Sequence, residues 1–271
     1  MSTRKPPEKF PALWASAWGE DTYGYWQAFE IRGVRQVMRW IPEGEFLMGS
    51  PENEAERSED EKQHKVVIPS GFWLADTTCT QQLWQAVMGN NPSDFDDDLQ
   101  NPVDSVSWES CEQFIKKANH LLQFDWFSLP TEEQWEYACR AGTTTPFNTG
   151  ETINTDQANF NGDFPYKKTE GKGAFRETTV PVLEFAPNSW GLFQMHGNIW
   201  EWCEDVYKTD YSGKSVPEDE KSSGLRVLRG GSWFYDARFL RSANRYANSP
   251  DRRSHFIGLR LAGGFDPQVS R

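Results

Sequence analysis

Apolar side chains recur at helical spacing in three short stretches of the first 142 residues. The first, TQQLWQAVMG (80–89), places leucine, tryptophan, valine and methionine on one face, between Thr80 as an N-cap and Gly89 as a C-cap. The same pattern recurs over residues 107–122 and 131–142, each opened by a serine or threonine that can cap the first turn. We therefore expect three short amphipathic helices, each with one buried face.

Other apolar runs are short and rich in aromatic and β-branched residues, which favours strands. YWQAFEI (25–31) and VRQVMRWI (34–41) predict two strands about a turn at Gly33. GEFLMGS (44–50) predicts a buried strand that ends in a glycine turn. Beyond residue 143 the helical pattern stops, and a long stretch rich in Thr, Asn and Gly follows. A stretch of this length needs contacts that hold it to the rest of the domain.

The order of these elements predicts one irregular domain, because neither an internal repeat nor a linker divides the chain. We expect an α+β fold with little regular secondary structure over residues 13–271. A polar, proline-rich N-terminal tail, residues 1–12, is expected to be disordered. The segment 13–35 is aromatic enough to pack either on this domain or on a partner.

The composition indicates how the core of such a domain is built. Hydrophobic residues make up 37% of the chain, whereas aromatic residues reach 14% and include 13 tryptophans. Large rings must therefore supply much of the buried area. The formal net charge of −12 argues against nucleic acid as a partner, because non-specific nucleic-acid binding needs a basic surface.

The cysteines and the N-terminal residues bear on the cellular compartment. The first 20 residues lack the apolar segment of a signal peptide, and no run of 18 apolar residues is present that could span a membrane. We expect the four cysteines to be buried free thiols, as in a reducing compartment, because they form no CxxC pair and have apolar or aromatic neighbours: Cys79, Cys111, Cys139 and Cys203. A cytoplasmic protein is the resulting expectation.

Arginine is concentrated in the last fifth of the chain. The positions concerned are Arg226, Arg229, Arg238, Arg241, Arg245, Arg252, Arg253 and Arg260. One interpretation is a set of scaffold arginines held in salt bridges. The other is a binding face that is locally less acidic than the rest of the chain.

Seven motifs occur in the order in which one known family has them: GEFLMGS, TQQLWQAVMGNNPS, NPVDSVSWESCEQF, LPTEEQWEYACRAG, ANFNG, PNSWGLFQMHGNIWEW and RVLRGGSW…RSANR…IGLRLA. Over about residues 36–262 the chain resembles the formylglycine-generating-enzyme-like proteins, also called the sulfatase-modifying-factor family. The resemblance implies a C-type-lectin-like fold, in which short helices and strands surround a small twisted sheet. Several functions occur on this fold, so the fold does not decide between them.

The enzyme that gives the family its name uses copper held by two cysteines shortly after the GGSW motif. In this chain Tyr235 and Leu240 stand at those positions, and no cysteine follows Cys203. A phenol and an isobutyl group cannot replace two thiolates that hold Cu(I). We therefore expect neither copper nor formylglycine generation. An enzyme of unrecognised chemistry stays an alternative.

The turn QMHGNIWEW resembles the calcium-binding turn of the family. The resemblance implies four oxygen ligands: the side chains of Gln194 and Glu201, and the carbonyls of Gly197 and Ile199. Gln194 is neutral and longer than the Asn or Asp of the family, which would weaken binding. One expectation is therefore calcium as a structural cofactor. The alternative is that Glu201 only hydrogen-bonds backbone amides in a buried turn.

One group within the family is built for variation: the variable proteins of diversity-generating retroelements. Their last segment is a ligand-binding face in which selected codons are rewritten as NNC or NNT. Such codons never encode Trp, Met, Lys, Glu or Gln. The resemblance implies a variable segment at about residues 226–262. Within it, twelve exchangeable positions alternate with fixed scaffold residues: Phe234, Tyr235, Asp236, Phe239, Tyr246, Ala247, Asn248, Ser249, Arg253, Ser254, His255 and Phe256.

The residue types between Phe234 and Phe256 agree with this interpretation. All twelve exchangeable positions hold residues that NNC or NNT encodes, and the stretch lacks the Lys, Glu, Gln and Trp that are common elsewhere. Rigid rings among small polar groups are typical of adaptable binding surfaces. We therefore expect a ligand-binding protein whose partner is a protein or another macromolecule. The alternative is a non-diversified accessory member of the family, in which these rings are ordinary core residues.

Overall fold

The three expected helices are present in the computed structural model, which describes residues 7–209 and 224–264. They are α1 (Gln81–Met88), α2 (Trp108–Leu122) and α3 (Glu132–Arg140). The predicted caps form: the Thr80 hydroxyl accepts a hydrogen bond from the N–H of Leu83, and Gly89 adopts a left-handed conformation. Ser107 and Thr131 each complete a capping box. None of the helices within the described ranges has the length and apolar composition of a membrane span.

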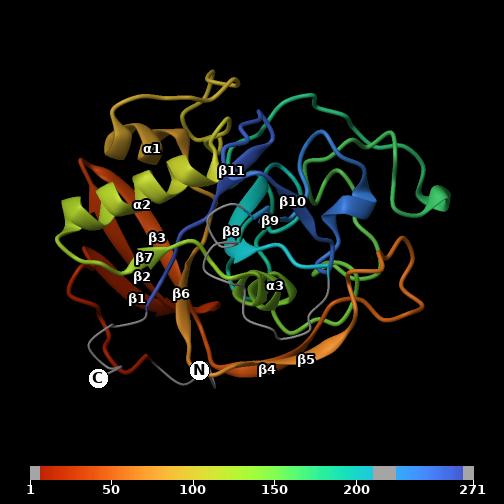
Figure 1. Ribbon diagram of the computed structural model, residues 1–271, viewed down its shortest axis with the longest axis horizontal. Helices are drawn as coiled ribbons and strands as arrows, with labels where there is room; N and C mark the ends of the chain where they lie inside the picture. The colour runs from red at the N-terminus through yellow and green to blue at the C-terminus, as the bar shows by residue number, and fades with distance from the viewer. Residues whose placement is uncertain (1–6, 210–223, 265–271) are drawn as a thin grey trace.

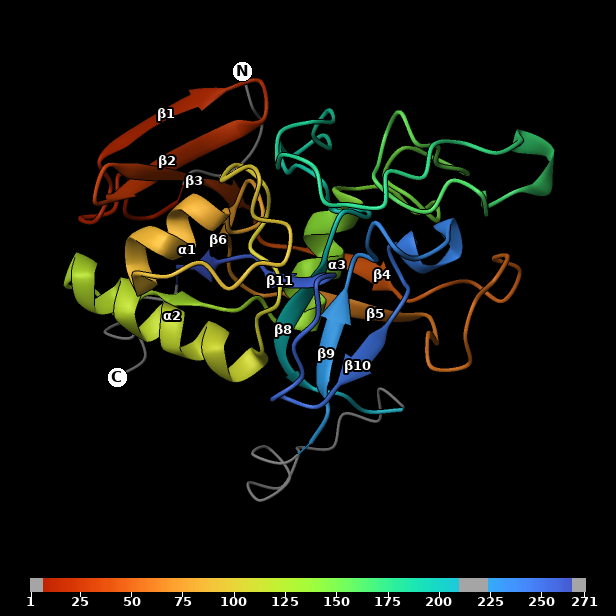
Figure 2. The same ribbon diagram turned by 90° about the horizontal axis from the view of Figure 1, so that it is seen from above.

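The strands pair into three sheets (Figures 1 and 2). The largest has the order β1-β2-β3-β6-β12-β7, with strands Ala17–Asp21, Gly24–Ile31, Val34–Ile41, Phe72–Ala75, Ala262–Gly263 and Phe127–Ser128. The second has the order β10-β9-β8-β11, with strands Tyr246–Asn248, Arg226–Arg229, Trp200–Val206 and Ile257–Leu259. The third is the hairpin of β4 (Gly44–Met48) and β5 (His64–Ile68). The expected α+β class and the strands expected around Gly33 are confirmed.

Aromatic rings fill the core between these elements, as the composition requires. Helices α1 and α2 lie on one face of the six-stranded sheet, and α3 lies beside β8 and the β4–β5 hairpin (Figures 1 and 2). Trp84 on α1 stacks on Phe114 on α2 with 4.9 Å between ring centroids. Trp200 and Trp202 of β8 are fully buried and extend the same core under the four-stranded sheet.

The N-terminal segment packs on this domain rather than remaining separate from it. Of the tail expected to be disordered, residues 1–6 lie outside the described residues. Phe10, however, lies 5.4 Å from Tyr25 and 6.1 Å from Trp73 between ring centroids, and Ala12 is buried. Residues 10–12 therefore belong to the domain, which corrects the expected boundary. The aromatic rings give these residues a hydrophobic surface to cover.

All four cysteines are buried and free, as predicted. Burial raises the pKa of the Cys139 thiol to about 12 and raises the pKa of the Cys79 thiol as well. These thiols are therefore protonated near neutral pH, and a buried protonated thiol is a poor nucleophile.

Candidate ligand-binding surface

The variable segment runs along the four-stranded sheet through the short 3₁₀ helix η2 (Ala237–Leu240), β10 and β11 (Figure 2). All twelve exchangeable positions are accessible to solvent: Phe234 and Arg253 are exposed, and the other ten are partly exposed. The scaffold residues that alternate with them are mostly buried, including Ala237 and the stretch 241–245. Most residues expected to be fixed are therefore buried, with Arg238 and Pro250 among the exceptions, whereas the residues expected to be exchangeable reach the surface.

Five rings of the exchangeable set form one continuous cluster centred on Tyr235. The ring of Tyr235 lies 5.1 Å from that of Phe239, 5.4 Å from Phe256 and 5.8 Å from Phe234. Tyr246 stacks on the fully buried Trp200 at 5.2 Å, so the cluster rests on the core. We call these five rings, all of them accessible to solvent, the aromatic face: Phe234, Tyr235, Phe239, Tyr246 and Phe256.

The aromatic face carries hydroxyl groups without carrying negative charge. Burial and a hydrogen bond with Tyr246 raise the pKa of the Tyr235 phenol above its usual range. Ionic groups lie at the margin instead, where Arg238 Nε is 3.2 Å from a carboxylate oxygen of Asp236. A surface of this kind can offer a partner apolar area and neutral hydrogen bonds.

Four buried arginines anchor the scaffold of the variable segment: Arg229, Arg241, Arg245 and Arg260. Arg241 contacts both oxygens of Glu61 at 2.7 and 2.8 Å and Glu54 at 2.8 Å, on the connection between β4 and β5. Arg245 donates to Glu132 of α3 at 2.6 and 3.0 Å. Such multidentate contacts fix the backbone that carries the aromatic face.

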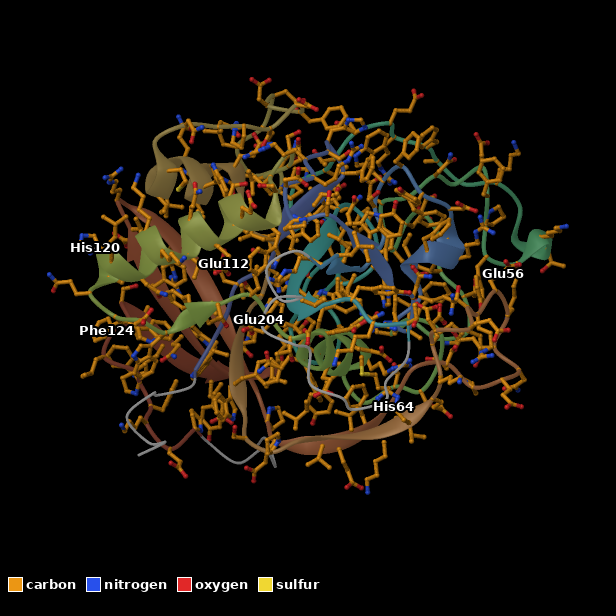
Figure 3. All side chains as sticks on the ribbon, in the orientation of Figure 1. Glu56, His64, Glu112, His120, Phe124 and Glu204 are labelled. Carbon is orange, nitrogen blue, oxygen red and sulfur yellow. The ribbon has the colours of Figure 1, made fainter. Side chains whose placement is uncertain are left out.

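The C-terminal arginines divide between the interior and the surface, and the interpretation as scaffold arginines is confirmed for the buried ones. The four anchor arginines form scaffold ion pairs in the interior. Arg252 and Arg253 are exposed, and the side chain of Arg238 is 50% exposed. Figure 3 labels Glu56, the partner of Arg238 at 3.9 Å, at the end of the molecule opposite to His120 and Phe124. The exposed η2 turn thus lies far from the C-terminal end of α2.

The ring of His196 joins the turn at Leu240 to the backbone at Asn148. Its Nδ1 lies 2.6 Å from the carbonyl oxygen of Leu240, and its Nε2 lies 3.0 Å from the backbone nitrogen of Asn148. Because a carbonyl only accepts and an amide N–H only donates, His196 is neutral with its proton on Nδ1. Burial lowers the pKa of His196 to about 4.

We expect His196 to make folding stability depend on pH below neutrality. Its pKa falls from 6.5 in the unfolded chain to about 4 in the folded protein, so the unfolded chain binds the proton more strongly. The free energy of unfolding should therefore decrease as the pH falls from 6.5 to 4, by roughly 2–3 kcal/mol from this residue. Denaturant unfolding at several pH values measures this. The decrease should be smaller in His196→Gln; an equal decrease in that variant would contradict the assignment.

The contacts of Glu201 do not fit the calcium site that the turn QMHGNIWEW predicts. Arg260 donates to Oε1 of Glu201 at 2.8 Å from Nη2 and to Oε2 at 3.0 Å from Nε. Trp135 donates its indole N–H to Oε2 at 2.6 Å. The guanidinium of Arg260 already balances the charge of this buried carboxylate. A cation bound there would therefore be repelled by the guanidinium. The partners are side chains, not the backbone amides of the alternative expectation.

Two of the other predicted calcium ligands, Gln194 and Gly197, also have protein partners. The side-chain oxygen of Gln194 accepts a hydrogen bond from the amide of Asn198 at 2.6 Å. The carbonyl of Gly197 accepts one from the N–H of Ile199 at 2.8 Å. The turn is therefore held by hydrogen bonds and the Glu201–Arg260 ion pair, and the chemistry of the donor set does not call for calcium.

Removal of calcium should leave the stability of the protein unchanged. A ligand that binds only the folded state raises the melting temperature, so a bound structural calcium ion would be revealed when a chelator removes it. We expect EDTA, followed by excess calcium, to shift the thermal midpoint by less than about 1 °C, which is well below the effect of 1 kcal/mol. A fall of several degrees that calcium reverses would contradict this expectation.

Two aromatic residues outside the variable segment extend the surface, and sequence reasoning missed them. Phe95 packs edge-on against Trp233 at 5.3 Å, and Phe175 stacks on Trp233 at 6.2 Å. Trp233 is buried and also contacts Phe234 and His255 at 5.5 Å. No sequence signal indicated these residues, because both lie in irregular loops far from residue 233 in the chain.

Comparison with known proteins places these features in a family. The model for the sulfatase-modifying factor enzyme 1-like domain matches residues 30–264. The serine/threonine-protein kinase pkn1 of Chlamydia caviae is 30% identical over 250 residues, which are 84% of this chain and 38% of the kinase. The formylglycine-generating enzyme of Streptomyces coelicolor is 34% identical over 178 residues, which are 61% of this chain and 54% of the enzyme. The chain thus spans about half or less of these relatives' own length.

One solved structure is similar to this chain over most of the length of both proteins. Variable protein 1 of Treponema denticola has a TM-score of 0.73 and 26% sequence identity, and the match covers 88% of this chain and 98% of that protein. The fold implied by the sequence motifs, an irregular α+β fold of the C-type-lectin-like type, is confirmed by this match.

Proposed function

The chain belongs to the family of sulfatase-modifying factor enzyme 1-like domains. We propose that this member is a ligand-binding protein with an exchangeable binding surface. The surface comprises the aromatic face and the polar exchangeable positions around it. Its partner is a protein or another macromolecule, because the surface is broad and no deep cavity is needed to contact it.

One observation carries this proposal: every exchangeable position is accessible, whereas the scaffold between them is largely buried and ion-paired. Substitutions at accessible positions change stability less than substitutions in the core do, so a surface of this kind can vary while the fold persists. Rings on a rigid support contribute contact area at low cost in conformational entropy. The similarity to variable protein 1 of Treponema denticola supports the same function.

Formylglycine generation is a weaker candidate for this chain. The two positions that carry copper-binding cysteines in that enzyme hold Tyr235 and Leu240, and Leu240 is fully buried against Gly231. All four cysteines are buried elsewhere in the domain. The residues at this position thus offer no soft ligands for Cu(I).

The DNA beside the gene tests whether the surface is diversified. The proposal predicts a near-copy of codons 226–262 that differs only where the copy has adenine, next to a reverse-transcriptase gene. A genome that carries neither would overturn diversification, and the rings would then be fixed contacts of an accessory member of the family. A diversified copy of the protein that bound the same target equally well would contradict the exchangeable surface.

A further inference from the structure

We infer that the binding surface includes a fixed subsite for an arginine side chain of a protein partner, formed by Asp94 and Phe95. This inference rests on the proposed function and specifies the chemistry of one part of the partner. The subsite lies in the loop that follows α1, outside the exchangeable positions. Asp94 and Phe95 themselves would therefore be present in every variant of the surface.

The loop that carries the subsite is held rigidly by a buried carboxylate. Asp104 is fully buried, and its two oxygens accept hydrogen bonds from the backbone N–H groups of Asp94 at 2.9 Å and Phe95 at 3.4 Å. The carbonyl of Phe95 accepts a further hydrogen bond from the amide of Gln81 at 2.6 Å. The backbone at both residues is thus fixed, which lowers the entropy that binding would have to overcome.

The subsite is continuous with the exchangeable surface. The ring of Phe95 lies 5.3 Å from Trp233 and 5.9 Å from His255, between ring centroids. The carboxylate of Asp94 lies 3.7 Å from Nδ1 of His255, which is an exchangeable position. A partner seated on the aromatic face would therefore reach both residues of the subsite.

The charge of the subsite favours a cation. The side chain of Asp94 is 62% exposed, and its single ionic contact among residues 7–209 and 224–264 is with His255. Arg253 donates to the carbonyl of Ser105 at 3.4 Å and forms no ion pair with Asp94 in the described part of the chain. The net charge of −12 also attracts a basic partner.

Arginine fits this pair of groups better than lysine does. A guanidinium is planar, stacks on an aromatic ring and donates two parallel hydrogen bonds to one carboxylate. Phe95 is partly exposed and offers the ring, and Asp94 offers the carboxylate on the adjacent residue. An ammonium group would form the ion pair without the stacking contact. The partner is therefore expected to insert an arginine at this edge of the surface.

Titration with capped arginine amide, followed by NMR, tests the subsite directly. The backbone amides of Asp94 and Phe95 should shift saturably, with a millimolar dissociation constant. Capped citrulline amide, which has the same shape without the charge, should give no saturable shift. Asp94→Asn and Phe95→Leu should each weaken arginine binding about threefold or more, as expected for an exposed ion pair or ring contact. The matched variant Asp97→Asn, in the same loop, should bind arginine as the unchanged protein does.

Three results would overturn the inference: no saturable shift with arginine, equal shifts with citrulline, or unchanged binding in Asp94→Asn. Each variant's amide spectrum reports whether it is folded, so a loss of binding through unfolding is recognised. Failure here would leave the proposed function intact, because none of the twelve exchangeable positions is altered. Conversely, arginine binding would persist if the surface were not diversified.

Discussion

Replacement of Arg241 by alanine is expected to destabilise the protein by about 3–5 kcal/mol, because it leaves a buried carboxylate without its partner. Both oxygens of Glu61 and one oxygen of Glu54 accept hydrogen bonds from Arg241. Glu61 and Arg241 are fully buried, so water cannot replace the lost contacts. Urea unfolding of the purified variant measures the change in free energy.

The matched control is Arg238→Ala, three residues earlier in the same segment. The side chain of Arg238 is 50% exposed, and its contacts with Asp236 and Glu56 lie at the surface. Exposed ion pairs of this kind contribute less than about 1 kcal/mol. Equal losses of stability in the two variants would contradict the role of Arg241 as an anchor of the variable segment.

Gly197→Ala is expected to cost roughly 2–5 kcal/mol, the sum of left-handed backbone strain and overpacking. Gly197 has a φ of +78°, and a Cβ there would lie 2.4 Å from the backbone oxygen of Asn159 and 3.0 Å from the side chain of Leu240. The backbone oxygen cannot move without disturbing the turn beneath η2. Thermal and urea unfolding of the variant test this, with no calcium added.

Gly89→Ala separates the two causes. Gly89 has a φ of +87°, but nothing lies within 4 Å of a Cβ built there. It should therefore show only the cost of the left-handed conformation, about 1–2 kcal/mol. If Gly197→Ala were no worse than Gly89→Ala, the close approach of the turn to Asn159 would not be essential.

Local signals explain why the helices were predictable from the sequence. The caps at Thr80, Ser107 and Thr131 depend on residues three positions away, and those hydrogen bonds form as expected. The exchangeable positions rest on a different basis, since resemblance and residue type indicate them, and they stay a prediction. Periodicity gave no help there, because the segment is mostly irregular and its accessible side follows no fixed repeat.

Long-range pairings explain what the sequence could not predict. The anchor contacts of Arg241 and Arg245 join residues more than 100 positions apart, so nothing local identifies the partners. The ion pair of Glu201 could not be predicted for the same reason. Arg260 donates hydrogen bonds to the carboxylate of Glu201 and lies 59 positions later in the chain. No motif links Arg260 to that turn.

The exchangeable positions are proposed to form a surface that can vary while the scaffold holds the fold. Two displayed libraries test this proposal. One carries NNC or NNT codons at the twelve exchangeable positions, and the other carries them at twelve buried scaffold positions between 227 and 262. The measurement is the fraction of members that resist protease.

We predict that the first library retains a folded fraction at least about tenfold larger than the second, because surface substitutions change stability little and core substitutions change it strongly. Similar losses in both libraries would contradict the claim. The rings of the aromatic face would then be ordinary core residues.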